Sequence, residues 1–286
     1  MGSSNNVVLL ISCKDTKGII ARVSNFIYEN NGNIEYADQH IDPANDIFFM
    51  RIEWSLKDFK IKKEEIAKEF KPLAESFNMN WKLYFTDEVL RIAIFVSQYQ
   101  HCLYDLLLRH RAGQLKCQIP LIISNYPFAQ RVAENFGIKF REFPINKDNR
   151  LQQEEKEVAL LKEEKIDLIV LARYNRILTS KIVDEFPNQI INIHHSFLPA
   201  FKGKAPYQQA YEKGVKIIGA TSHYVTEELD AGPIIEQDTV RISHRDSLQD
   251  LVRKGEDLEK VVLSRAVRWH LERKILVYNN KTVIFD

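Results

Sequence analysis

Residues 189–201 read QIINIHHSFLPAF, and this stretch decides how the rest of the chain is interpreted. Its first half is apolar and rich in β-branched residues, which predicts a buried strand over Gln189–Ile193. Polar side chains sit at the carboxyl end of this strand, where open α/β sheets bind ligands. Asn192 and His194 are two positions apart, so their side chains lie on one face of an extended chain. An amide beside an imidazole suits a site that stabilises an oxyanion and moves a proton.

Apolar strands alternate with amphipathic helices on both sides of this stretch. Further strands are expected at 91–97, 119–124, 139–143, 167–171, 217–225 and 233–241. Helices are expected at 102–112, 129–136, 152–164, 179–185 and 247–270, and a hairpin at 275–285. This order predicts a doubly wound, mostly parallel α/β domain over residues 87–286.

The first 86 residues have a different order of elements. Strands are expected at 7–13, 34–41, 47–55 and 79–85, and helices at 19–31 and 62–77. The order β-α-β-β-α-β predicts a ferredoxin-like α+β domain over residues 1–86. Asp15 and Gly18 lie between its first strand and first helix, where they form either an effector site or only a tight turn.

Composition limits the function classes that need to be considered. The chain has 286 residues, 45% of them hydrophobic, which is enough for two cores. Its net charge is +1 and it has no basic stripe or tail, so neither a nucleic acid nor a membrane is the expected partner. Three cysteines without CxxC spacing fit a reducing cytosol, and the apolar run at 7–11 is too short for a signal peptide. We therefore expect a cytoplasmic protein.

Asp230 is a second candidate for the chemistry. It precedes Gly232 and Pro233, which places it in a turn before a strand. A carboxylate near an imidazole orients water and tunes protonation, but Asp230 also fits a simple turn former. The adjacent His194 and His195 point to opposite faces of a strand, which is poor geometry for two ligands of one ion, so no metal is expected.

Residues 192–199 carry the pattern Asn-x-His-x-Ser-x-Leu-Pro, and Asp-x-Gly follows at 230–232. This pattern resembles the formyltetrahydrofolate-dependent formyltransferase family over roughly residues 91–240. The resemblance implies that Asn192, His194 and Asp230 are the catalytic set. It also implies four further substrate contacts: Arg176 and Leu178 would line a pterin pocket, partly through backbone groups, and Gly219 and Thr221 belong to the region that would close over it.

Within that family, four features resemble the formyltetrahydrofolate deformylases. His195 stands where transferases usually have proline, and the loop at 97–103 has no glycines to cradle a phosphate. The chain is expected to lack the extra C-terminal domain that methionyl-tRNA formyltransferases use for their acceptor, because it ends near residue 286. Its first domain resembles an ACT domain. One departure is Gly-Lys-Ala-Pro-Tyr at 203–207, where deformylases usually have a basic residue at position 205.

A deformylase hydrolyses 10-formyltetrahydrofolate to formate and tetrahydrofolate, so the resemblance implies a folate substrate and no retained cofactor. It further implies a supply of formate for purine synthesis and a balance of one-carbon pools. Asn192 would bind the oxyanion, His194 would shuttle a proton, and Asp230 would position the attacking water. An amino-acid effector at the ACT domain and a homo-oligomer are also expected.

Two other functions stay open: a formyltransferase acting on a small amine, and a folate-binding regulator without turnover. Several residues also have two interpretations. Ser97 and His101 line the acceptor side, or cap a helix and pack in the core. His195 shapes the water site or only fills space, and Arg176 binds folate or pairs with an exposed acid.

Overall fold

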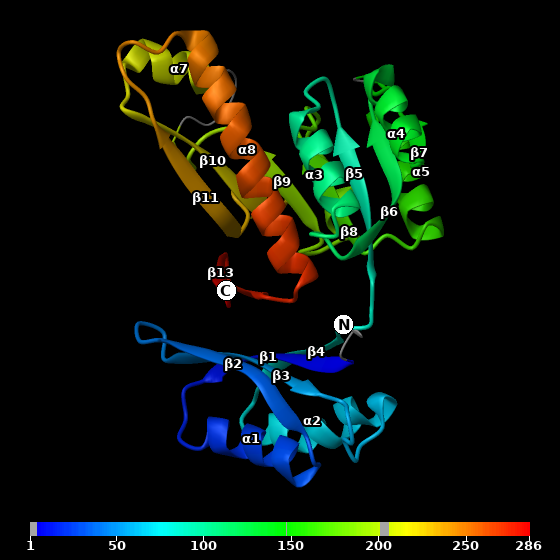
Figure 1. Ribbon diagram of the computed structural model, residues 1–286, viewed down its shortest axis with the longest axis vertical. Coiled ribbons are helices and arrows are strands. Elements are labelled where there is room, and N and C mark those ends of the chain that lie inside the picture. The colour runs from blue at the N-terminus through cyan, green and yellow to red at the C-terminus, as the bar shows by residue number, and fades with distance from the viewer. Residues whose placement is uncertain (1–4, 147, 201–205) are drawn as a thin grey trace. The chain divides into compact units, whose positions relative to one another are not determined.

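The computed structural model describes residues 5–146, 148–200 and 206–286 (Figure 1). Its contacts divide the chain into two compact units. The first unit extends to Val89 and includes Val283–Asp286, and the second covers Leu90–Thr282. The departure from the deformylase pattern at Lys204 and Ala205 lies outside the described residues.

The first unit is a four-stranded antiparallel sheet with two helices on one face (Figure 1). The strands follow the order β2 (Asn33–Asp42), β3 (Ile47–Ser55), β1 (Asn6–Lys14) and β4 (Asn80–Phe85). The helices are α1 (Ile19–Glu29) and α2 (Ile66–Ser76), the second preceded by a 3-10 turn at Lys63–Glu65. This arrangement confirms the predicted ferredoxin-like fold.

The turn between β1 and α1 contains the two residues predicted to bind an effector. Gly18 has φ +96°, in the left-handed region that favours glycine, and it directly precedes α1. The Asp15 N–H donates to the Asp46 carbonyl at 2.9 Å. Both observations describe a tight turn, and effector binding there stays a prediction.

The second unit contains a seven-stranded sheet in which five strands are parallel. The strand order is β11 (Ile234–Arg241), β10 (Ile217–Tyr224), β9 (Ile190–His194), β8 (Leu168–Ala172), β5 (Leu90–Val96), β6 (Cys117–Ser124) and β7 (Lys139–Glu142). β10 and β11 run antiparallel to their neighbours. The chain moves outward from β5 to β7 and then returns to β8 on the other side, which confirms the predicted doubly wound sheet.

Helices connect and cover these strands (Figure 1). They are α3 (His101–Arg111), α4 (Gln130–Phe136) after a 3-10 turn at Pro127–Ala129, α5 (Arg150–Glu163), α6 (Ser180–Val183), α7 (Pro206–Lys213) and α8 (Leu248–Leu271). Ser247 caps α8 in a reciprocal capping box with Asp250, as a helix starting at this serine requires. Along its length α8 packs on α3, α7 and the strands β9, β10 and β11.

A short hairpin of β12 (Ile275–Tyr278) and β13 (Lys281–Ile284) follows α8. Among the described residues, no helix combines the length and apolar composition that a membrane crossing would need.

Helix α5 turns two acidic side chains into the protein interior. Glu154 and Glu157 are 1% and 0% exposed. Glu154 accepts hydrogen bonds from the backbone N–H and the hydroxyl of Thr179, which follows the 173–178 segment. Burial, reinforced by the nearby Glu154 charge, raises the pKa of Glu157 to about 8. Glu157 is therefore protonated at neutral pH.

We expect Glu157→Gln to stabilise the protein at alkaline pH and to change its stability little at pH 5. An unfolded glutamate has a pKa of about 4.3, so the folded state holds an extra proton between that value and about 8. The stability of the unchanged protein therefore falls as pH rises through this window, whereas glutamine stays neutral. Thermal unfolding at pH 5, 7 and 9 measures the effect, with the exposed Glu163→Gln as control. A difference in melting temperature that did not grow with pH would contradict the assignment.

Candidate active site

The end of β9 carries Asn192 and His194, as the sequence pattern predicts. β9 pairs with β8 on one side and with β10 on the other. The register with β10 sets His223 opposite Asn192, and Thr221 opposite His194. Because directly opposed residues share a face of the sheet, His223 joins the two predicted residues.

Asp230 reaches this group through a turn that follows β10. Its backbone has φ +54°, in the left-handed region. A Cβ on Gly232 would lie 1.8 Å from the Tyr224 carbonyl oxygen, so only glycine permits this close approach. The Tyr224 N–H also donates to the Pro233 carbonyl at 2.9 Å. These contacts hold the turn against the end of β10.

The predicted catalytic side chains come together, with His223 among them. Asp230 Oδ2 lies 3.3 Å from His194 Nδ1, and Asp230 Oδ1 lies 3.7 Å from His223 Nε2. Asn192 Nδ2 lies 3.2 Å from His223 Nε2. The side chains of His194, His223 and Asp230 are 6%, 3% and 11% exposed, so their interactions are largely shielded from water.

The protonation of this cluster follows from its contacts. Burial alone would raise the pKa of Asp230, but the hydrogen bond from His194, together with the nearby His223 ring, outweighs burial and holds this pKa well below its usual value. The carboxylate is therefore ionised and accepts a hydrogen bond from His194 Nδ1–H. The other ring nitrogen, His194 Nε2, is buried and has no hydrogen-bond partner among the described residues. That nitrogen is the one left to face a reacting group.

His223 is a member of this cluster that the sequence did not single out. Its Nδ1 lies 2.9 Å from the Tyr224 carbonyl, which only accepts, so Nδ1 carries a proton. In the neutral ring, Nε2 then accepts from the Asn192 amide. His223 thereby fixes which way the Asn192 NH2 points. The sequence signal was its alternation with Thr221 in β10, but the register with β9 was not known.

Gly219 and Thr221, predicted to contact substrate, both pack against the loop that follows β9. A Cβ on Gly219 would lie 2.8 Å from Phe197 Cβ. Thr221 is fully buried; its hydroxyl accepts from the Leu198 N–H at 3.0 Å and donates to the Ser196 carbonyl at 2.9 Å. Their contacts therefore hold the 196–198 backbone in place beside His194.

Ser97, Arg176 and Leu178 belong to segments that follow β5 and β8 at the same edge of the sheet. Ser97 is 1% exposed, and its Oγ lies 2.6 Å from Asn125 Oδ1 and accepts from the Asn175 N–H at 3.0 Å. Arg176 is half-buried, and its Nε has no hydrogen-bond partner among the described residues. Leu178 is buried in the hydrophobic core, so a contact of Leu178 with substrate would involve its backbone.

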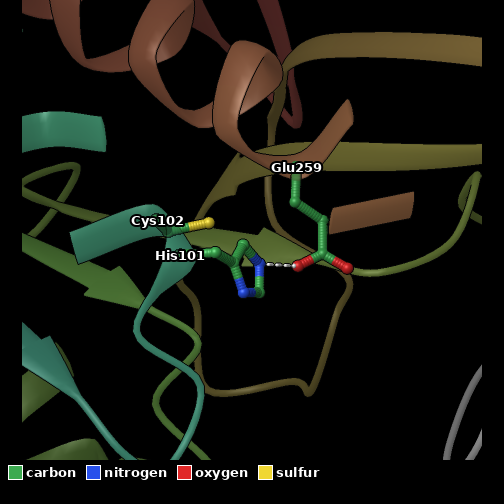
Figure 2. A group of neighbouring side chains, drawn as sticks. All are labelled: His101, Cys102 and Glu259. Carbon is green, nitrogen blue, oxygen red and sulfur yellow. Dashed lines mark hydrogen bonds and ion pairs between the residues drawn. The ribbon is translucent and has the colours of Figure 1, made fainter. Parts of the chain in front are cut away.

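His101 is held by a buried carboxylate from α8 (Figure 2). Its Nε2 donates to Glu259 Oε2 at 2.7 Å, and Glu259 is 0% exposed. The same carboxylate lies 3.3 Å from Arg173 Nε and accepts from the Tyr207 hydroxyl at 2.6 Å. Burial acts to raise the pKa of Glu259, but His101, Arg173 and Tyr207 outweigh it and lower that pKa, so the carboxylate is charged.

His101, Cys102 and Glu259 also place a nitrogen, a sulfur and an oxygen within 4.8 Å of one another, a spacing that a metal ion could use (Figure 2). Metals bind the thiolate form of cysteine. Burial, with the Glu259 charge, holds the pKa of the Cys102 thiol well above its usual value. Arg173 already neutralises the carboxylate. The donor set therefore fits a self-contained ion-pair cluster better than a metal site.

His195 stays uncharged beside the His194 ring. Burial, followed by the positive charge of Arg173, lowers its pKa to about 3. Its ring lies 5.3 Å from that of His194 and packs edge-on against Tyr207 at 5.9 Å. A neutral imidazole thus stands on the side of His194 that faces α7.

Comparisons with known proteins identify the family of both domains. Residues 90–267 match the formyl transferase family model, and residues 7–72 match the ACT domain model. The chain is 56% identical to a formyltetrahydrofolate deformylase from Synechocystis sp., over 97% of both chains. It is 46% identical to the Bacillus subtilis deformylase, over 100% of this chain and 95% of the relative.

Solved structures give the same result. A formyltetrahydrofolate deformylase from Pseudomonas syringae superposes with a TM-score of 0.97 at 43% identity, covering 100% of this chain and 96% of that one. A glycinamide ribonucleotide transformylase from Symbiobacterium toebii gives 0.67 at 31% identity, covering 72% of this chain and 98% of that one. The transferase likeness covers part of the chain, whereas the deformylase likeness covers both domains. The chain therefore belongs to the formyltetrahydrofolate deformylase family.

Proposed function

We propose that the protein hydrolyses 10-formyltetrahydrofolate to formate and tetrahydrofolate at the cluster of Asn192, His194 and Asp230. The observation that carries this proposal is the ionised Asp230 beside His194, at the carboxyl edge of the sheet, in a chain similar to deformylases over nearly its whole length. The formate released would supply purine synthesis and balance one-carbon pools. The ACT domain would take a small-molecule effector, an amino acid being our proposal.

The reaction requires a nucleophilic water, an oxyanion site and a proton for the departing folate nitrogen. Asp230 is charged and accepts hydrogen bonds, so it positions the attacking water, and His194 Nε2 takes the proton that this water loses. Asn192, oriented by His223, donates to the oxyanion that forms on the formyl carbon. His194 then delivers a proton to the folate nitrogen as the carbon–nitrogen bond breaks. These steps use no metal ion or cofactor.

The remaining substrate contacts follow from the same edge of the sheet. The segment 173–178 comes directly after β8 and would contact the pterin, with Arg176 supplying donors and Leu178 acting through its backbone. Gly219 and Thr221 would act indirectly, because they position the loop at 196–198. Neutral His195 would shape the space for water.

Product analysis tests the function. With 10-formyltetrahydrofolate and no amine, we expect formate and tetrahydrofolate in equal amounts, and almost complete loss of both in Asp230→Asn. Asparagine keeps the size of the side chain but loses the charge that holds the proton of His194. The exposed Asp238 side chain belongs to β11, so Asp238→Asn serves as control. Tight folate binding without formate would contradict hydrolysis and would favour the regulator.

We expect Asn192→Ala to lower kcat by about 100- to 1,000-fold with a much smaller change in KM, because the lost hydrogen bond forms chiefly in the transition state. Steady-state kinetics measure this, and the exposed Asn135→Ala on α4 is the control. Near-normal turnover in Asn192→Ala would exclude the oxyanion role.

His223→Phe tests whether this histidine acts through Asn192. We expect kcat to fall by about tenfold, as for one lost orienting hydrogen bond. The double variant Asn192→Ala/His223→Phe should be no slower than Asn192→Ala alone, because the group that His223 orients is already missing. Multiplicative losses in the double variant would show instead that His223 acts independently. The exposed His244→Phe is the control.

A further inference from the structure

The carboxyl ends of β5 and β8 mark the point at which the strand order reverses. Open α/β sheets bind ligands in the crevice at such a point. In this protein the residues that follow the two strands bond to each other. Ser97, after β5, accepts from the Asn175 N–H at 3.0 Å and lies 2.8 Å from Asn175 Oδ1. The inner part of the crevice is thus closed by the protein's own polar groups.

Four side chains extend this closure; we call His101, Arg173, Tyr207 and Glu259 the crevice network. Arg173 directly follows β8 and has φ +63°, an unusual conformation for a residue with a side chain. Its guanidinium lies 4.9 Å from the centre of the Tyr99 ring, which lies on the loop after β5. Glu259 reaches into the crevice network from α8 and contacts Arg173, His101 and Tyr207.

Close packing holds the crevice network in place. A Cβ on Gly255 would lie 2.1 Å from the Tyr207 hydroxyl oxygen, so Tyr207 is pressed directly against α8. The side chains of His101 and Arg173 are each 14% exposed, and Glu259 is 0% exposed. Breaking a buried ion pair leaves an uncompensated charge, so an entering molecule would not readily displace one member.

The crevice network reaches the His194 ring through His195. Tyr207 packs edge-on against His195 at 5.9 Å, and the His195 ring lies 5.3 Å from that of His194. A molecule bound in the crevice would therefore stand next to the group that handles the proton. In this structure the ion pair of Arg173 and Glu259 stands there instead.

We propose that the crevice network excludes amine acceptors and so commits the formyl group to water. This inference rests on the proposed hydrolysis. In the excluded reaction, an amine nitrogen would attack the formyl carbon and form a new carbon–nitrogen bond. The bond to the folate nitrogen would break, and the proton lost by the amine would end on that nitrogen. Water needs no pocket of its own, whereas a primary amine with a substituent needs room for the rest of its structure.

The test measures how the formyl group is divided between two acceptors. The full-length protein is incubated with 10-formyltetrahydrofolate and rising concentrations of glycinamide, and formate and N-formylglycinamide are measured by mass spectrometry after subtraction of an enzyme-free blank. Two variants are compared: His101→Ala, and the double variant Arg173→Ala/Glu259→Ala, which removes both charges of the ion pair together. The control is Asp246→Asn. This change breaks the ion pair of Asp246 with Lys254 (2.8 Å), a residue of α8 outside the crevice network.

The unchanged protein and Asp246→Asn should release formate alone, at a rate that glycinamide does not lower. The ratio of N-formylglycinamide to formate should rise at least about tenfold in the two variants, whatever their total rate. If the double variant does not fold, the product ratio of His101→Ala tests the proposal. This variant should still fold because it leaves the Glu259–Arg173 pair intact. Folded variants with the unchanged ratio would overturn the proposal, as would formyl transfer to glycinamide, or inhibition by it, in the unchanged protein. Absence of formate from the unchanged protein would instead refute the hydrolysis itself.

Discussion

Asp230 keeps a negative charge although its side chain is 11% exposed, and the geometry of the site depends on this charge. Burial without donors would protonate such a carboxyl group. Two imidazole rings face it, and the contact commits His194 Nδ1 to Asp230, which leaves His194 Nε2 for the substrate. The left-handed turn at Asp230 and the glycine at 232 bring the carboxylate into reach. The protonation of the site therefore depends on the backbone turn at Asp230 and on the strand register that places the two rings.

Buried acids in the second unit show how strongly the surroundings decide protonation. Glu259 is fully buried, yet it stays ionised because His101, Arg173 and Tyr207 all contact its carboxylate. Glu157 is equally buried, but its charged neighbour is another acid, and its pKa rises to about 8. The difference lies in whether cations or hydrogen-bond donors surround the group, not in the depth of burial.

Local periodicity predicted most of the fold. The order of strands and helices in both units follows from runs and periods of apolar residues. Element ends differ by a few residues because helix and strand termini are weakly determined. The shared face of Asn192 and His194 follows from the two-residue period of a strand. The residues alone left Asp230 open between a carboxylate that orients water and a simple turn former, and the family pattern favoured the first. Its approach to His194 depends on a turn and on Gly232.

Long-range packing was the part that the sequence did not reveal. His223 and Asn192 are 31 positions apart in the chain, and they meet through the register of β9 with β10. Glu259 resembles an ordinary charged residue of an amphipathic helix, and nothing local shows that it faces Arg173 and His101. Both depend on which elements become neighbours after folding, and no period within one element encodes that choice.

The scaffold alone does not choose between hydrolysis and transfer, because the chain is also similar in structure to a glycinamide ribonucleotide transformylase. The choice must lie in side chains at the carboxyl edge of the sheet. Asn192, His194 and Asp230 suit either reaction, since both create an oxyanion on the formyl carbon and protonate the same nitrogen. What distinguishes the reactions is the space beside His194. Here that space is bounded by a neutral His195, which packs on Tyr207 of the crevice network, and we propose that this leaves His194 to meet a small nucleophile.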